Sequence, residues 1–385
     1  MADSDNGEIS AWHYATRQPV HVRWRDGVIT HVEAAASAPP HDLWLAPSLF
    51  DLQINGFAGV DFQQDGLTGE DLLHATRRLR AAGCTRYLLT LITDDWHALT
   101  VRLRHLRALR AQSAELQSAI AGWHIEGPFL SAEPGFHGAH DPARMVDPTL
   151  EHFLELRSVT GEDLLLLTVS PERRGVLDVI ELAVSRGAKV SLGHTDAPAR
   201  ILGAAIKAGA TGFTHLGNGC PRELDRHDNI LWRVLDTPGL TVSLIPDRIH
   251  VSPPFFRLVH RVLNPSAIYY TTDAMAAASA PPGHYKLGRL EVEVGADQIV
   301  RQPGKTNFAG SAAQPIDTVF HAAEMLGCAW QEAWPHFSEV PAKFMGLHNE
   351  LEVQNPASIC VLKVAGLNQL IDLQVYADGK TTASR

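Results

Sequence analysis

Cysteine is scarce in this sequence, and the few cysteines are widely spaced. Only four occur among 385 residues, at Cys84, Cys220, Cys328 and Cys360, and no two of them form a CxxC pair. This spacing argues against a disulfide framework, which needs an even set of cysteines at close intervals. We therefore expect the protein to work in a reducing compartment, the cytoplasm.

Long apolar runs and an excess of basic charge are also missing. No run of 18 apolar residues occurs, and no apolar segment follows a basic start, so we predict neither a membrane span nor a secretory signal. The 43 acidic and 33 basic residues give a formal net charge of −10, which argues against a nucleic-acid binder that works by bulk charge. A few local cations would still suffice for a small anionic substrate.

The residues that are present predict an α/β protein with a substantial core. Apolar residues make up 45% of the chain and charged residues 20%, as in ordinary globular proteins. Short apolar runs alternate with helical patterns about eight times, which favours a (β/α)₈ TIM-type barrel over an open sheet. Short alternating segments at 8–35 and 358–379 predict a small β-sandwich domain built from both termini. We therefore divide the chain into 1–46, 47–345 and 346–385, with the barrel in the middle.

Two segments have alternative interpretations. The basic stretch "VRLRHLRALR" (101–110) could bind a membrane surface, but its leucine spacing favours an outer barrel helix with arginines in water. The stretch "PPGHYKLG" (281–288) is interpreted as a loop rather than as a cofactor-binding segment.

Polar residues follow nearly every predicted strand. In a barrel of this kind, the carboxyl ends of the strands share one rim, where reactive groups gather. The rim candidates are acids, imidazoles and amides: Asp51, Gln53, Asn55, Glu126, His194, His215, Asn218, Asp247, His250 and Asp273. We expect the active site at this rim. His124 lies one alternation before Glu126 and is predicted to fill the barrel interior.

Three of these residues form a plausible metal-binding set. Glu126, His194 and His215 supply one carboxylate and two imidazoles, which suits a divalent transition metal with an open coordination position. Such a cation lowers the pKa of water toward ~7, and a nearby carboxylate such as Asp273 can then act as the acid and base.

The order of the motifs resembles the amidohydrolase superfamily, and within it the N-acetylglucosamine-6-phosphate deacetylase family. The resemblance runs over most of the chain and rests on eight segments: "APSLFDLQINGFAGVDF" (46–62), "HIEGPFLS" (124–131), "GAHDP" (138–142), "SLGHTDA" (191–197), "THLGNGC" (214–220), "LIPDRIHVSP" (244–253), "TTDAMAAASAPPGHYKLG" (271–288) and "NFAGSAAQPIDTV" (307–319).

This resemblance implies the reaction and the residues that perform it. The reaction is removal of the N-acetyl group from an amino sugar, with N-acetylglucosamine 6-phosphate as the predicted substrate and glucosamine 6-phosphate and acetate as products. The metal ligands would be Glu126, His194 and His215, with Asp273 as the catalytic acid and base and His140 polarising the carbonyl. The resemblance further implies that the sugar site is lined by Ala139, Asn218, Gly219, Phe308, Ala309 and Gly310.

The resemblance also implies a single metal and a homodimer. Many superfamily members carry His-x-His on the first strand and bind two metals, whereas this chain has Gln53 and Asn55 there. We predict one divalent ion, zinc, with iron or another divalent metal as alternatives. Arg226 and His250 would lie at the anionic end of the sugar, with Arg226 reaching the neighbouring site of the dimer.

Some motifs differ from the family pattern and leave alternatives open. Arg226 is followed by His227-Asp228-Asn229, where Glu-Pro-Gly is usual. Asp228 could pair with Arg226 and weaken its hold on an anion, or Arg248 could supply another cation. The alternative functions are deacetylation of a different or unphosphorylated N-acetyl amino sugar, another amidohydrolase reaction such as deamination or cyclic-amide hydrolysis, and, more remotely, a non-catalytic binding barrel.

Overall fold

A ring of eight parallel strands forms the centre of the molecule. The computed structural model describes residues 5–305 and 307–382. The sheet order is β14-β13-β12-β11-β10-β9-β8-β5, and each pair of neighbours is parallel. A parallel bridge between Ile54 and Ala274 joins the two edges. The predicted (β/α)₈ barrel is therefore confirmed.

The barrel strands are short and almost wholly buried, as expected when helices cover a parallel sheet. They are β5 (Leu49–Ile54), β8 (Cys84–Ile92), β9 (Ile120–Glu126), β10 (Leu164–Val169), β11 (Lys189–Leu192), β12 (Gly212–Phe213), β13 (Thr241–Leu244) and β14 (Ile268–Tyr270).

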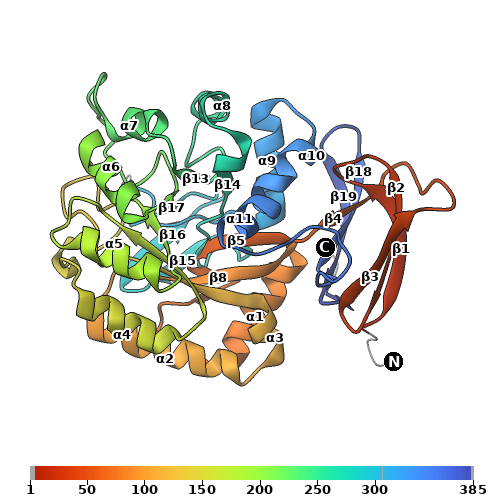
Figure 1. The fold of residues 1–385 in the computed structure, drawn as a ribbon, viewed down its shortest axis with the longest axis horizontal. Helices are drawn as coiled ribbons and strands as arrows, with labels where there is room; N and C mark the ends of the chain where they lie inside the picture. The colour runs from red at the N-terminus through yellow and green to blue at the C-terminus, as the bar shows by residue number, and fades with distance from the viewer. Residues whose placement is uncertain (1–4, 306, 383–385) are drawn as a thin grey trace.

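Helices surround this ring (Figure 1). They are α1 (Gly69–Ala81), α2 (Trp96–Ala111), α3 (Ala114–Ala119), α4 (Leu150–Thr160), α5 (Val176–Ser185), α6 (Ala199–Ala208), α7 (Ile230–Asp236), α8 (Pro253–Val262), α9 (Pro315–Leu326), α10 (Trp330–Ala333) and α11 (Glu339–Phe344). Short 3₁₀ turns occur at Pro142–Arg144, Pro265–Ala267 and Trp334–Phe337.

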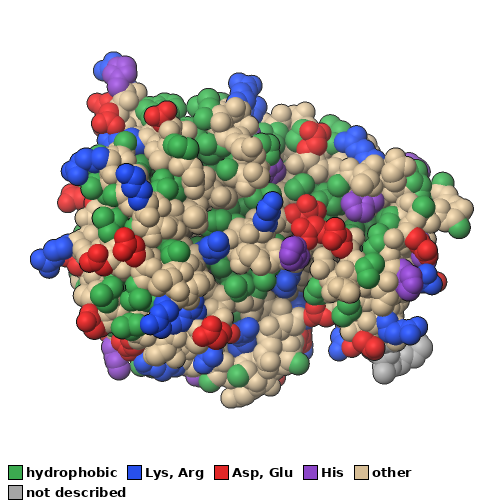
Figure 2. All heavy atoms as spheres, in the orientation of Figure 1, with side chains coloured by type: hydrophobic (Ala, Val, Ile, Leu, Met, Phe, Trp, Pro, Cys, Tyr) green, Lys and Arg blue, Asp and Glu red, His purple; other side chains and the backbone are tan. Residues whose placement is uncertain are grey.

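The basic stretch at 101–110 lies in α2, an outer helix. Its Leu103 and Leu106 are buried, and most of its arginines reach solvent, as the leucine spacing predicts. Arg102 is the exception, because its side chain is buried beside a carboxylate of the barrel rim. Among the helices of the described residues, none is both long and apolar enough to cross a bilayer. Acidic and basic side chains are interspersed on the face shown in Figure 2.

Both ends of the chain meet in one seven-stranded sheet beside the barrel (Figure 1). Its order is β20 (Lys380–Thr381), β19 (Gln369–Ala377), β18 (Ile359–Ala365), β4 (Leu43–Pro47), β1 (Gly7–His13), β2 (Pro19–Arg25) and β3 (Val28–Ala34). Strand β4 joins the two ends, because it pairs with β18 on one side and with β1 on the other. The small β-domain from both termini is thus confirmed, while its boundaries at 46/47 and 345/346 stay predictions.

Two insertions build walls above the carboxyl ends of the barrel strands. A small hairpin, β6 (Gly56–Phe57) and β7 (Val60–Asp61), follows β5. An antiparallel sheet of β15 (Gly283–Leu287), β16 (Leu290–Val294) and β17 (Val300–Arg301) follows β14. The segment 281–288, which the sequence suggested to be a loop, therefore contains a strand. Its tip is tied to the first hairpin, because Gly288 N donates to the Asp61 carboxylate at 2.8 Å.

Candidate active site

The predicted metal ligands and the predicted acid come together at the carboxyl ends of the strands. Glu126 is the last residue of β9, while His194 and His215 each lie two residues beyond the ends of β11 and β12. All three are buried. Asp273 follows β14 and is half-buried. His194, His215 and Asp273 have φ angles of 50°, 34° and 53°, a left-handed conformation that non-glycine residues rarely adopt outside sites with a special requirement.

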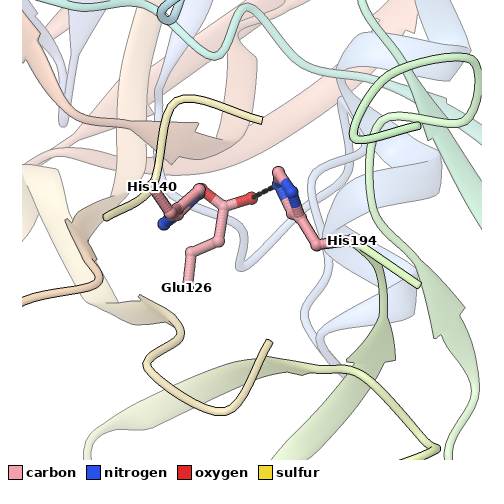
Figure 3. Close-up of side chains that lie close together, drawn as sticks. All are labelled: Glu126, His140 and His194. Atoms are coloured by element: carbon pink, nitrogen blue, oxygen red, sulfur yellow. Dashed lines mark ion pairs between the residues drawn. The ribbon is translucent and has the colours of Figure 1, made fainter. Parts of the chain in front are cut away.

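Three imidazoles surround the Glu126 carboxylate. The Oε1 atom lies 2.8 Å from His215 Nε2 and 3.5 Å from His194 Nε2, and the Oε2 atom lies 3.6 Å from His140 Nε2. Ligand atoms of Glu126, His140 and His194 all lie within 4.8 Å of one another, and Figure 3 shows this group with the carboxylate between the two imidazoles. Such a buried set of one carboxylate and two imidazoles fits a divalent metal.

The hydrogen bonds of His194 explain why a cation fits this site. Its Nδ1 lies 2.8 Å from the carbonyl oxygen of Phe136, which can only accept, so Nδ1 carries the proton. In the tautomer that this bond selects, Nε2 is the acceptor, and it faces the Glu126 carboxylate at 3.5 Å. Two acceptors facing each other are stabilised when a cation lies between them.

His140 is a fourth member of this cluster. Its spacing in the sequence does not by itself predict that it lies beside Glu126. It arrives on the loop after β9, and its Nδ1 lies 2.8 Å from Thr93 Oγ1 and accepts a hydrogen bond from Thr93 N at 3.4 Å. Burial, followed by the neighbouring imidazole of His194, lowers the pKa of His140 to about 3, so the His140 ring is neutral. His124 instead lies deeper in the barrel, where its Nε2 is 2.8 Å from Thr168 Oγ1.

The two carboxyl groups of the site have opposite pKa shifts. Burial alone would raise the pKa of Glu126, but the neighbouring imidazoles of His194 and His215 lower it well below its usual value. Burial, reinforced by the charge of Glu126, raises the pKa of Asp273 to about 8. Two carboxyl groups with separated pKa values are typical of a site in which one stays ionised and the other exchanges a proton.

A cavity of about 1220 Å³ opens above this cluster and is lined by most of the predicted substrate-binding residues. Ala139, Asn218, Gly219, His250, Phe308 and Gly310 form part of its lining. Ala309 is fully buried behind the lining. Arg226 lies on the exposed surface outside it, so any contact of Arg226 with a neighbouring site stays a prediction.

The segments that differ from the family pattern raised two possibilities: that Asp228 pairs with Arg226, or that Arg248 supplies a cation to the site. The structure shows neither arrangement. Among the described residues, Asp228 pairs with Arg233 at 2.5 Å and not with Arg226. Arg248 pairs with Glu324 on α9 and does not line the cavity. The cavity instead takes its cations from residues that sequence reasoning missed: Arg102, Arg144, Arg222, Arg289, Arg301 and Lys305. No motif marks them, because several reach the cavity from insertions and outer helices.

Comparison with known proteins places the chain in a family. No family model matches it. The chain is 32% identical over 313 residues to the N-acetylglucosamine-6-phosphate deacetylase of Mus musculus, covering 79% of this chain and 75% of the relative. It belongs to the N-acetylglucosamine-6-phosphate deacetylase family. The relative of the same name from Bacillus subtilis is 29% identical over 311 residues, with 80% and 77% covered.

Solved structures of this deacetylase family share the whole fold. The enzyme of Mycobacterium smegmatis is 26% identical and has a TM-score of 0.87, with 98% of this chain and 99% of the other covered. The structure from Thermotoga maritima is 23% identical with a TM-score of 0.86, and this likeness concerns the fold alone. These relatives therefore confirm the family that the sequence motifs resemble.

Proposed function

We propose that the protein removes the acetyl group from N-acetylglucosamine 6-phosphate, giving glucosamine 6-phosphate and acetate. The observation that carries this proposal is the buried cluster of Glu126, His194 and His215 facing one cavity with the high-pKa carboxyl of Asp273. The names of the relatives support it, and one related structure holds N-acetyl-D-glucosamine-6-phosphate.

A single divalent metal, zinc in our proposal, would be held by Glu126, His194 and His215. When bound, it supplies a Lewis acid that polarises the amide carbonyl and makes water a better nucleophile. His140 Nε2 lies 3.6 Å from the Glu126 carboxylate, nearly as close as His194, but the hydrogen bond from Thr93 N to His140 Nδ1 favours the tautomer with a proton on Nε2. A protonated Nε2 cannot bind a metal, whereas it can donate to the oxygen on which negative charge develops.

Asp273 performs the proton transfers in this proposal. Its carboxylate accepts a proton from the attacking water as the new carbon–oxygen bond forms. It then delivers that proton to the nitrogen as the carbon–nitrogen bond breaks, and so returns to its starting state. A pKa near neutrality suits both directions of transfer.

The anionic end of the substrate would be bound by the cations of the cavity. Sugar-lining roles are proposed for Ala139, Asn218, Gly219, His250 and the turn Phe308–Gly310, and His250 Nδ1 is itself held by Asp247 Oδ2 at 2.6 Å. Since Arg226 lies outside its own cavity, we propose that it serves the neighbouring site of a homodimer.

The described cysteines are all free, which supports a reducing compartment, the cytoplasm.

The test is acetate release from N-acetylglucosamine 6-phosphate, with unphosphorylated N-acetylglucosamine and other N-acetyl hexosamine phosphates in parallel. Cyclic amides and aminopyrimidines cover the rival amidohydrolase reactions. We expect the first substrate to react fastest and Asp273→Asn to keep its metal but lose turnover by at least ~100-fold, as for loss of a general acid–base group. A metal-loaded protein that turns over a cyclic amide or a pyrimidine, and no N-acetyl sugar, would refute the proposal.

A further inference from the structure

Asn55 is a buried polar residue of the site to which neither the motifs nor the reaction assigns a role. It directly follows β5, the strand that also carries Asp51 and Gln53. The Asn55 side chain lines the cavity and is 1% exposed. Its Nδ2 donates a hydrogen bond of 2.7 Å to Asp273 Oδ1.

The backbone fixes the two ends of this bond. Asn55 N donates to the carbonyl oxygen of Ala274 at 2.7 Å, at the seam where the barrel closes. On the other side, the Asp51 carboxylate accepts a hydrogen bond of 3.0 Å from Thr272 N and one of 2.6 Å from Thr272 Oγ1. The segment that carries Asp273 is therefore held by β5 both before and after the catalytic residue.

The bond selects one oxygen of the catalytic carboxyl. Among the described residues, Asn55 provides the side-chain hydrogen bond to Asp273, and this bond engages Oδ1. The amide turns its NH₂ toward Oδ1, so this oxygen is the acceptor of the bond. Asn55 Oδ1 is buried without a partner in the described structure, which is unusual for an asparagine kept for packing alone.

We propose that Asn55 is a positioning residue that anchors Asp273 through Oδ1, so that Oδ2 is the atom that carries the proton. In the hydrolysis, Oδ2 takes a proton from water as the carbon–oxygen bond forms and gives it to the nitrogen as the carbon–nitrogen bond breaks. An anchored carboxyl keeps Oδ2 aligned with both partners, whereas a freely rotating one would be productive for only part of the time. This inference rests on the proposed deacetylation.

The test replaces Asn55 by leucine, which keeps a similar shape and removes the donor. We expect kcat for N-acetylglucosamine 6-phosphate to fall about 10- to 100-fold, with KM changed less than about 3-fold and metal content unchanged. Asn55→Ser is the second variant if the leucine protein does not fold. The matched control is Ser48→Ala at the opposite end of β5, which removes another buried bond, of 2.6 Å to Thr85 Oγ1, and should leave kcat within 2-fold.

A second substrate separates positioning from general disturbance. In the 2-acetylthio analogue of the sugar phosphate, the leaving thiolate needs no proton, so the loss caused by Asn55→Leu should be several-fold smaller than on the amide. Equal losses on both substrates, a normal kcat, or a loss of metal in the Asn55 variants would overturn the inference. If the wild-type protein releases no acetate, the proposed function itself fails, which is a different result from an active wild type with a fully active Asn55→Leu.

Discussion

Asp94 holds three separate segments together at the mouth of the cavity, and its removal gives a sharp test of the structure. Its side chain is 7% exposed and lies 3.3 Å from Arg102 on α2, 3.0 Å from Arg289 at the tip of the β15–β16 hairpin, and 3.4 Å from Arg144. The perturbation is Asp94→Ala, which removes the common partner of all three guanidinium groups.

The expected magnitude follows from the burial of Arg102. Its side chain is also 7% exposed, and its remaining partner, Asp65, is 90% exposed and hydrated. Removing one member of a buried ion pair lowers the free energy of unfolding by about 3–5 kcal/mol. Because Arg102 keeps its contact with Asp65, we expect a loss near the lower end, about 3 kcal/mol. The control is Glu33→Ala, which breaks the Arg23–Glu33 pair with exposures of 41% and 54%. A surface pair of this kind contributes at most about 1 kcal/mol.

The assay is urea unfolding of both variants and the wild type, with the free energy taken from midpoint and slope. Burial alone would raise the pKa of Asp94, but the hydrogen bond from Arg289 and the charge of Arg102 lower it below its usual value. The carboxylate therefore stabilises the fold above the usual carboxyl pKa, and this contribution is lost as pH falls through the lowered folded-state value. If Asp94→Ala and Glu33→Ala lowered the free energy of unfolding equally at neutral pH, Arg102 would have to be hydrated. That result would refute the buried ion pair between Asp94 and Arg102.

Three further predictions concern the metal, the barrel and a buried acid. His215→Ala should lose most of the bound metal while His140→Ala retains it, as measured by metal analysis of the purified variants; the reverse result would exchange their roles. Gly122→Ala should destabilise the protein strongly in urea, because the added Cβ would lie 2.3 Å from a carbonyl oxygen of the next strand, whereas Gly69→Ala has open space and should not. Burial raises the pKa of Asp51 to about 6, so its contribution to stability is present below the ordinary pKa of about 4 and lost as pH rises through 6. Relative to Asp51→Asn, the wild type should therefore lose up to about 3 kcal/mol of unfolding free energy between pH 4 and 7, and a constant difference would contradict this.

The fold and the centre of the site could be predicted because both depend on local patterns. Buried strands followed by amphipathic helices specify a parallel barrel, and the barrel then brings residues after separate strands to one rim. This is why Glu126, His194, His215 and Asp273 could be grouped although up to 147 positions separate them, and the structure brings all four to one cavity.

The surroundings of the site could not be predicted, because they depend on contacts that no periodicity encodes. Asp94 and Arg289 are 195 positions apart and meet only because a hairpin after β14 folds over the barrel. The same hairpin lies in a stretch whose glycines and prolines suggested a loop. Arg102 lies on a helix whose arginines otherwise face water, so its burial depends on the position of Asp94 and not on the helical pattern.

The backbone conformation at the active site explains why sequence patterns do not predict the geometry of the site. The left-handed conformations of His194, His215 and Asp273 each cost about 1–3 kcal/mol, so they persist only where other bonds enforce them. Three serines supply such bonds: Ser170 Oγ donates to the His194 carbonyl at 2.6 Å, Ser243 Oγ accepts from His215 N at 2.6 Å, and Ser311 N donates to the Asp273 carbonyl at 2.9 Å. Each serine comes from a different segment than the residue it holds. The orientation of the catalytic side chains is therefore a property of the closed barrel, and no single motif contains it.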